Sequence, residues 1–106
     1  MVYDVRIYDF KPGKVPEYMK AVRELALPIR KDHGVELAAW FHTAIGELNQ
    51  VIHVWAYKSL AHMEKAKAEV EADPRWFGEY VPRVQPLIVK MRDQIMLAPD
   101  FAPQES

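Results

Sequence analysis

The sequence of 106 residues contains no cysteine. Disulfide bonds, thiolate zinc sites and cysteine nucleophiles are therefore excluded, and the composition fits a reducing compartment, so we predict a cytoplasmic protein. The chain opens on a strand pattern without a basic stretch and apolar run, and its apolar runs are only a few residues long. We therefore expect no signal peptide and no membrane partner.

The sequence also lacks an excess of either charge, with 14 Lys plus Arg against 15 Asp plus Glu. Proteins that bind nucleic acid usually carry a basic excess or a basic stripe, so we expect no nucleic-acid partner. Half of the residues are apolar. That fraction exceeds what one small domain over residues 1–106 needs, and part of the apolar surface is expected to serve a partner or a ligand.

Hydrophobic periodicity predicts the element order β-α-β-β-α-β. The predicted strands cover 3–8, 36–44, 50–57 and 87–97, and the predicted helices begin near Val15, Ser59 and Asp73. Pro28 is expected to kink or end the first helix near Leu27, and Gly34 to stop it. This order predicts an α+β ferredoxin-like fold with a four-stranded antiparallel sheet and helices on one face. The Pro-rich tail over 98–106 is predicted to be loosely held.

The alternation along the strands separates an aliphatic residue set from an aromatic and polar set. We expect the aliphatic set to face the helices: Val5, Ile7, Leu37, Phe41, Ile52, Val54, Val89 and Met91. The opposite set then holds two Trp and two Tyr, which is too apolar for an open face. We therefore predict a homodimer, or a higher assembly, whose two sheets enclose a polar-lined cavity. A bulge near Asp93 could shift these assignments.

Three stretches of the sequence resemble the NIPSNAP family. They are Tyr3 to Tyr8 with the turn Lys11-Pro-Gly-Lys14, the block Ile45 to Tyr57, and Asp73-Pro-Arg-Trp76. The resemblance implies a dimeric α/β barrel, a group that includes cofactor-free monooxygenases, haem-degrading monooxygenases, muconolactone isomerases and chlorite dismutases. It implies no particular reaction, because the family has no settled catalytic mechanism. Asp4 stands where family members more often have Glu.

His53 and His42 are the candidate catalytic residues, because a histidine near its free pKa can act as a base or an acid at neutral pH. A base in an apolar pocket could deprotonate an enolisable or phenolic substrate and allow cofactor-independent monooxygenase or isomerase chemistry. The alternative is a hydrogen-bonded histidine that only lines a dimer cavity. His42, His53 and Glu36 show no compact ligand spacing, so we predict no metal site and no cofactor.

The candidate ligand-binding residues are two arginines and four aromatic residues. Arg6 and Arg92 could bind a substrate carboxylate, or could pair with Asp4, Glu36 or Asp93. Tyr8, Trp40, Trp55 and Tyr57 could stack a flat small molecule, or could form core and interface. The sequence thus predicts a homodimeric small-molecule-binding barrel. The alternative is a non-enzymatic interaction or ligand-sensing module, in which the same residues only stabilise the dimer.

Overall fold

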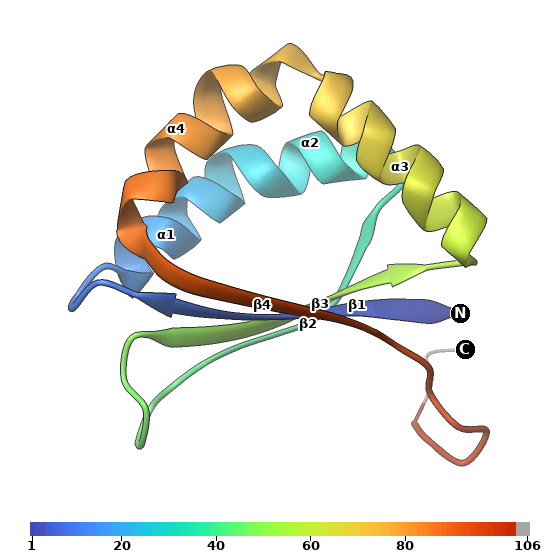
Figure 1. The fold of residues 1–106 in the computed structure, drawn as a ribbon, viewed down its shortest axis with the longest axis horizontal. Coiled ribbons are helices and arrows are strands. Elements are labelled where there is room, and N and C mark those ends of the chain that lie inside the picture. The colour runs from blue at the N-terminus through green and yellow to red at the C-terminus, as the bar shows by residue number, and fades with distance from the viewer. Residues whose placement is uncertain (104–106) are drawn as a thin grey trace.

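The computed structural model describes residues 1–103 and has the predicted ferredoxin-like order (Figure 1). The strands are β1 (Val2–Phe10), β2 (Glu36–His42), β3 (Gln50–Tyr57) and β4 (Ile88–Met96). The helical segments are α1 (Val15–Ala21), η1 (Val22–Ala26), α2 (Leu27–Asp32), α3 (Leu60–Ala72), η2 (Trp76–Tyr80), α4 (Val81–Val84) and η3 (Gln85–Leu87). The strands form one antiparallel sheet in the order β2-β3-β1-β4, and the helices cover one of its faces (Figure 1).

The turn and cap chemistry of the sequence explains where these elements begin and end. Gly13 has a φ of 76°, and the Lys14 N–H donates to the Lys11 carbonyl over 3.1 Å, as a type II turn requires. The Ser59 hydroxyl accepts from the His62 N–H and caps α3. Gly34 has a φ of 74° and ends α2 in the left-handed region, as predicted.

Pro28 does not end the first helix, which continues through α2 to Asp32, so of the predicted kink or end near Leu27 only the end is wrong. The regular α-helical hydrogen bonding is interrupted just before Leu27. The reason is a π-helical turn, η1, in which the Leu27 N–H donates to the Val22 carbonyl. The wider turn accommodates the proline ring without ending the helix. The second helical stretch has the same feature, since the π-helical turn η2 lies just before Pro82. The two π-helical turns pack against each other.

The sequence prediction assigns the two faces of β1 and β3, and Phe41 of β2, the wrong way round, whereas Leu37 and Met91 lie on the helical side as predicted. Tyr8, His53, Trp55 and Tyr57 are buried beneath the helices, whereas Phe41 is 65% exposed on the face without helices. The register supports this arrangement, because Phe41 pairs with Ile52 across β2 and β3. Both residue sets are apolar enough to be covered, so alternation alone does not say which set the helices cover.

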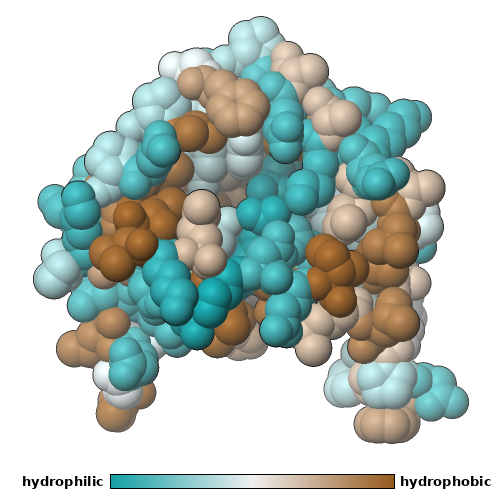
Figure 2. All heavy atoms as spheres, viewed as in Figure 1, coloured by the Kyte–Doolittle hydropathy of each residue, from teal (hydrophilic) through white to brown (hydrophobic). Residues whose placement is uncertain are grey.

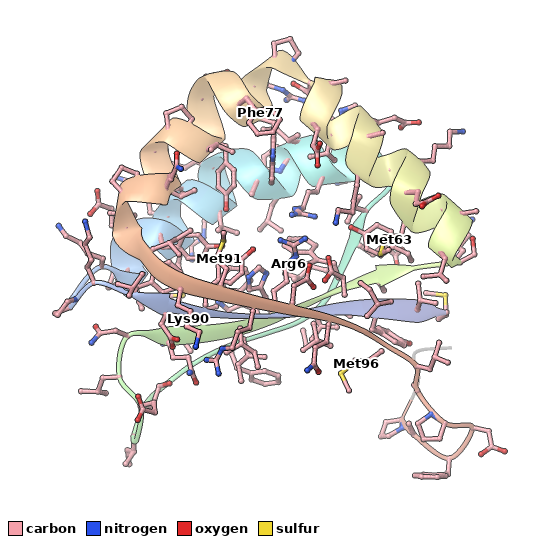
Figure 3. All side chains as sticks on the ribbon, in the orientation of Figure 1. Arg6, Met63, Phe77, Lys90, Met91 and Met96 are labelled. Carbon is pink, nitrogen blue, oxygen red and sulfur yellow. The ribbon has the colours of Figure 1, made fainter. Side chains whose placement is uncertain are left out.

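Figure 3 shows the same division, with Arg6 and Met91 on the helical side of the sheet and Met96 on the other side. The face without helices is called the open face below. It carries the other strand residues, chiefly Tyr3, Val5, Ile7, Ala39, Phe41, Ile52, Val54, Arg92, Gln94 and Met96.

The expected bulge near Asp93 is absent, because β1 and β4 pair in regular register from Tyr3 to Asp9. The register instead shifts between Asp9 and Phe10, and a second shift lies between Leu37 and Ala39 on β2. Asp93 consequently points to the helical side, opposite Arg6. Of the predicted loose tail, residues 104–106 lie outside the described residues, and 98–103 contain no helix or strand.

The core lies between the sheet and the helices and is unusually rich in aromatic rings. Tyr18 of α1 lies at 4.4 Å from Phe10 and 6.2 Å from Tyr8, measured between ring centroids. Trp40 stacks on Tyr18 at 5.9 Å. Within residues 1–103, no helix combines the length and the apolar character needed to cross a membrane.

Candidate functional site

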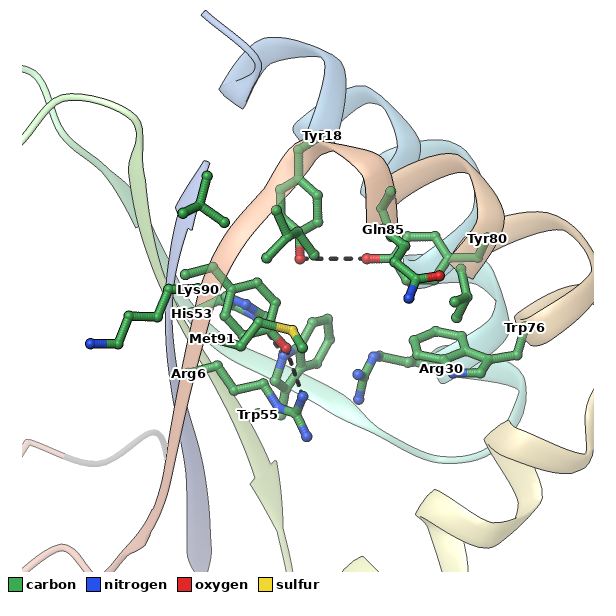
Figure 4. Close-up of a pocket in the computed structure, with 15 residues that line it drawn as sticks. Arg6, Tyr18, Arg30, His53, Trp55, Trp76, Tyr80, Gln85, Lys90 and Met91 are labelled. Atoms are coloured by element: carbon green, nitrogen blue, oxygen red, sulfur yellow. Dashed lines mark hydrogen bonds between the residues drawn. The ribbon is translucent and has the colours of Figure 1, made fainter. Parts of the chain in front are cut away.

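A cavity of about 370 Å³ lies between the helices and the sheet of the single chain. Figure 2 shows this side of the molecule hollowed between the helical layer and β4, and Figure 4 shows the lining side chains. The sheet contributes Arg6, Tyr8, His53, Trp55 and Met91, and the helical layer contributes Tyr18, Arg30, Trp76, Tyr80, Val81, Val84 and Gln85. This volume suits a small organic molecule.

Arg30 is a buried cation without an anionic partner. It is 8% exposed, and its guanidinium carbon lies 4.2 Å from the centroid of the Trp55 ring and 5.0 Å from that of Trp76. No ion pair within residues 1–103 includes Arg30, and its buried Nε has no hydrogen-bond partner among them. Figure 4 shows the guanidinium directed into the cavity. The two indoles stabilise the cation but do not neutralise it.

Arg6 reaches the cavity from β1 with its charge already compensated. Its Nε donates to Asp4 Oδ2 over 2.9 Å, and one terminal nitrogen lies 3.4 Å from Asp93 Oδ2. The other terminal nitrogen donates to the Tyr8 hydroxyl over 2.7 Å. Burial disfavours the guanidinium charge, but Tyr8 and Asp4 outweigh burial and raise the pKa of Arg6 above its ordinary value. Asp4 and Asp93, two of the three carboxylates that the sequence analysis names as alternative partners, thus form ion pairs with Arg6.

The carboxyls of Asp4 and Asp93 share this guanidinium and influence one another. Burial and the neighbouring Asp4 raise the pKa of Asp93 to about 6. Burial opposes ionisation of Asp4 as well, but Asp93 and Arg6 outweigh it and lower the pKa of Asp4. Asp4 is fully buried and Asp93 is partly exposed, so Asp4 is the member of the pair that stays ionised.

His53 lies at the centre of the cavity wall as a neutral ring. The Trp55 indole N–H donates to His53 Nδ1 over 2.7 Å, so the ring proton of the neutral form is on Nε2. Burial, followed by the charges of Arg6 and Arg30, lowers the pKa of His53 to about 3. In this arrangement His53 could act as a base only if the hydrogen bond from Trp55 broke.

Two tyrosines line the helical side of the cavity and remain protonated at neutral pH. The Tyr80 hydroxyl donates to the Tyr18 hydroxyl over 3.4 Å (Figure 4). Burial raises the pKa of Tyr80 to about 12, and burial followed by Tyr80 raises the pKa of Tyr18. Tyr18 can therefore donate a hydrogen bond to an occupant of the cavity, whereas Tyr80 already donates its only proton to Tyr18.

The structure brings four of the eight predicted site residues into the cavity wall: Arg6, Tyr8, His53 and Trp55. Trp40 and Tyr57 lie in the same layer but behind the wall. The ring centroid of Trp40 is 4.6 Å from that of His53, and Tyr57 is fully buried. His42 is exposed at the end of β2, and Arg92 lies on the open face, where it bonds Asp9 over 3.3 Å.

The sequence interpretation missed Arg30, Tyr18, Trp76 and Tyr80 as cavity residues. Arg30 carried a usable signal, because it lies four residues after Ala26 and eight after Val22, on the buried stripe of the first helix. A charged residue on an apolar stripe points to a buried site. Among residues 1–103, no three His, Asp or Glu side chains converge as a metal site would require.

The family model and the curated relatives that match this chain belong to the same family. A family model described as NIPSNAP matches residues 3–103. The protein NipSnap of Drosophila melanogaster is 32% identical over 104 residues, which cover 98% of this chain and 37% of that protein. The chain therefore spans little more than a third of that curated relative.

Solved structures extend the comparison to the whole fold. A NIPSNAP family protein with unknown function from Agrobacterium tumefaciens has a TM-score of 0.89 and 36% identity, over 97% of this chain and 92% of that one. A dimeric ferredoxin-like protein from an uncultured marine organism has a TM-score of 0.74 and 13% identity, over 97% and 92% of the two chains. The second likeness is one of fold alone.

Proposed function

The chain belongs to the NIPSNAP family, and we propose that it acts as a homodimer in which each subunit binds a small organic anion in its own cavity. The observation that carries this proposal is Arg30, a buried guanidinium held between two indoles with no carboxylate beside it. A desolvated charge without a partner is costly, and an anionic ligand supplies the missing partner.

The side chains that line the cavity indicate the shape and polarity of the part of the ligand beside its anionic group. Trp55, Trp76 and Met91 offer apolar and aromatic surface, so the ligand has a flat apolar body beside its anionic group. Arg6 adds little net charge, because Asp4 and Asp93 already neutralise it. The ligand class is therefore a small aryl or unsaturated carboxylate, or another acid of that shape.

A second copy of the chain is the proposed partner of the open face. Phe41 is 65% exposed and Met96 47% exposed there, beside the half-buried aliphatic residues of β1 and β3. An apolar sheet face of this kind is rarely left in water, and twofold pairs are the commonest assemblies. The marine ferredoxin-like neighbour is described as dimeric, which supports a homodimer without indicating the face through which it forms. Cavity and dimer face then lie on opposite sides of the sheet.

Ligand selectivity tests the proposed function. Benzoate, cinnamate and 1-naphthoate would be compared with their uncharged primary amides by isothermal titration calorimetry. We expect at least one acid to bind ten or more times tighter than its amide, because only the acid pairs with Arg30. The variant Arg30→Gln should lose this preference.

The matched control is Arg83→Gln, since Arg83 is an arginine of α4 that pairs with Glu24 at the surface and does not line the cavity. It should bind the acids as the wild type does. Equal binding of acids and amides, or no binding of either, would contradict the proposed function. An unchanged preference in Arg30→Gln would do so as well.

A further inference from the structure

The polar groups of the cavity wall are mostly hydrogen-bond donors, and the exception among the described side chains is the amide oxygen of Gln85. Arg30 offers a guanidinium without an ion pair in the described part of the chain, and burial raises the pKa values of Tyr18 and Tyr80, so both hydroxyls keep their protons. No carboxylate lines the cavity within residues 1–103. The only imidazole, His53, already uses its lone pair to accept from Trp55. The wall therefore holds no free base.

We infer that the cavity takes a ligand with an ionisable O–H group, an enol or a phenol, and holds it as its conjugate base. The inference rests on the proposed function and narrows it from organic anions in general to acids that are mostly neutral in water. For a neutral O–H group the described residues of the wall offer the Gln85 amide oxygen and tyrosine hydroxyls as side-chain acceptors, but no carboxylate and no free imidazole nitrogen. The ionised oxygen would instead meet donors and the charge of Arg30.

The charges around the cavity favour the same form. Arg30 contributes a full positive charge, whereas Arg6 is balanced by Asp4 and Asp93. Lys90 borders the cavity, but its side chain leads away from it (Figure 4). A single uncompensated cation within a few ångströms lowers the pKa of a neighbouring acid by roughly 1 to 3 units.

The proposed step is a simple ionisation. The O–H bond of the bound ligand breaks, the oxygen keeps the electron pair, and the proton passes to solvent water through the open side above β4. In an enolate or phenolate the pair is shared with carbon, so the bound ligand becomes a carbon nucleophile. The cavity acts by stabilising the product anion rather than by supplying a base.

The pH titration of bound 4-nitrophenol tests this step, because its phenolate absorbs visible light and its phenol does not. With the wild-type protein in excess, we expect the bound probe to be at least ten times more acidic than the free probe. Linkage requires the phenolate then to bind at least ten times tighter than the phenol. Arg30→Gln should abolish most of this shift, Arg30→Lys should retain part of it, and Arg83→Gln should leave it unchanged.

The titration with the wild-type protein tests whether the ligand is bound as its conjugate base, even where a variant folds poorly. Quenching of the tryptophan fluorescence would show that 4-nitrophenol is bound. A bound probe that titrates at or above the pH of the free probe would overturn the inference. So would aryl carboxylates that bind through Arg30 while 4-nitrophenol does not, although the proposed function would then stand. Failure of both kinds of probe to bind would overturn both.

Discussion

The two faces of the sheet differ in which side chains they carry and in what covers them. The helical side buries charged and aromatic side chains. It pairs Asp4 with Arg6 within one chain but leaves Arg30 without an ion pair among the described residues. The open face carries aliphatic side chains and leaves Phe41 65% exposed. The comparison shows that the more hydrophobic-looking face of a sheet need not be the one that its own helices cover. A face with paired charges can be internal, and an aliphatic face can be kept for a partner.

The largest expected effect on folding comes from breaking the internal charge pairing. Asp4→Asn leaves the mostly buried Arg6 with only Asp93, at 3.4 Å, as a counter-ion. We expect the free energy of unfolding to fall by about 3 kcal/mol, because removing one partner of a buried pair leaves an uncompensated charge. Urea denaturation at fixed protein concentration measures this loss.

Asp9→Asn is the matched control, since Asp9 lies on the same strand but on the open face, where it bonds the exposed Arg92. Its cost should stay under about 1 kcal/mol. Similar losses in the two variants would remove the distinction between the faces.

A charge on the open face should act on assembly rather than on folding. Phe41→Glu places a carboxylate on an exposed position of the subunit, so the fold should tolerate it. In the dimer the same carboxylate would be buried without a partner, and we expect dimer affinity to fall at least a hundredfold, about 2.7 kcal/mol. Sedimentation equilibrium measures this. A wild-type chain that is already monomeric would contradict the role given to the open face.

The smallest expected effect is a change in how stability depends on pH. The pKa of His53 is about 3 in the folded chain, against 6.5 for a free histidine, because of burial and the charges of Arg6 and Arg30. Below pH 6.5 the unfolded chain binds a proton that the folded chain does not. The contribution of His53 is therefore complete above pH 6.5 and is lost as the pH falls toward 3, by at most about 1.4 kcal/mol per pH unit.

His53→Gln should lack this loss, because an amide oxygen can still accept from Trp55 and does not titrate. The difference between wild type and variant is the quantity to measure, by urea denaturation between pH 7 and pH 4.5. Asp93 works in the opposite direction, since its pKa is raised to about 6 and its contribution is lost as the pH rises from 3.8 through 6. That term is common to both proteins. Parallel pH curves would mean that His53 is not buried as a neutral ring.

The fold could be predicted from the sequence because local signals agree with one another. The Pro12-Gly13 turn, the Ser59 cap and the left-handed Gly34 each mark a boundary where the structure has one. The π-helical turn before Pro28 could not be predicted in this way. A proline inside a helical pattern is equally compatible with an end of the helix, so the residue types alone do not distinguish the two outcomes.

The candidate site could be predicted only in part. Arg6, Tyr8, His53 and Trp55 share one face of the sheet, so strand alternation grouped them correctly. Their placement under the helices depended on which face is covered, and alternation is symmetric in that respect. Arg30 of α2 and Trp76 of η2 come from different helices, and the contacts of Arg30 with Trp55 and Trp76 require the three-dimensional arrangement of both helices on the sheet.

The most direct test of this account is ligand binding by the monomeric Phe41→Glu variant, measured by calorimetry with the aryl carboxylate that binds the wild type. Because the cavity lies within one chain, we predict one bound ligand per subunit with an affinity within about threefold of the wild type, on the order of 0.7 kcal/mol. A monomer that folds but no longer binds would contradict it, since the site would then depend on two sheets packed face to face.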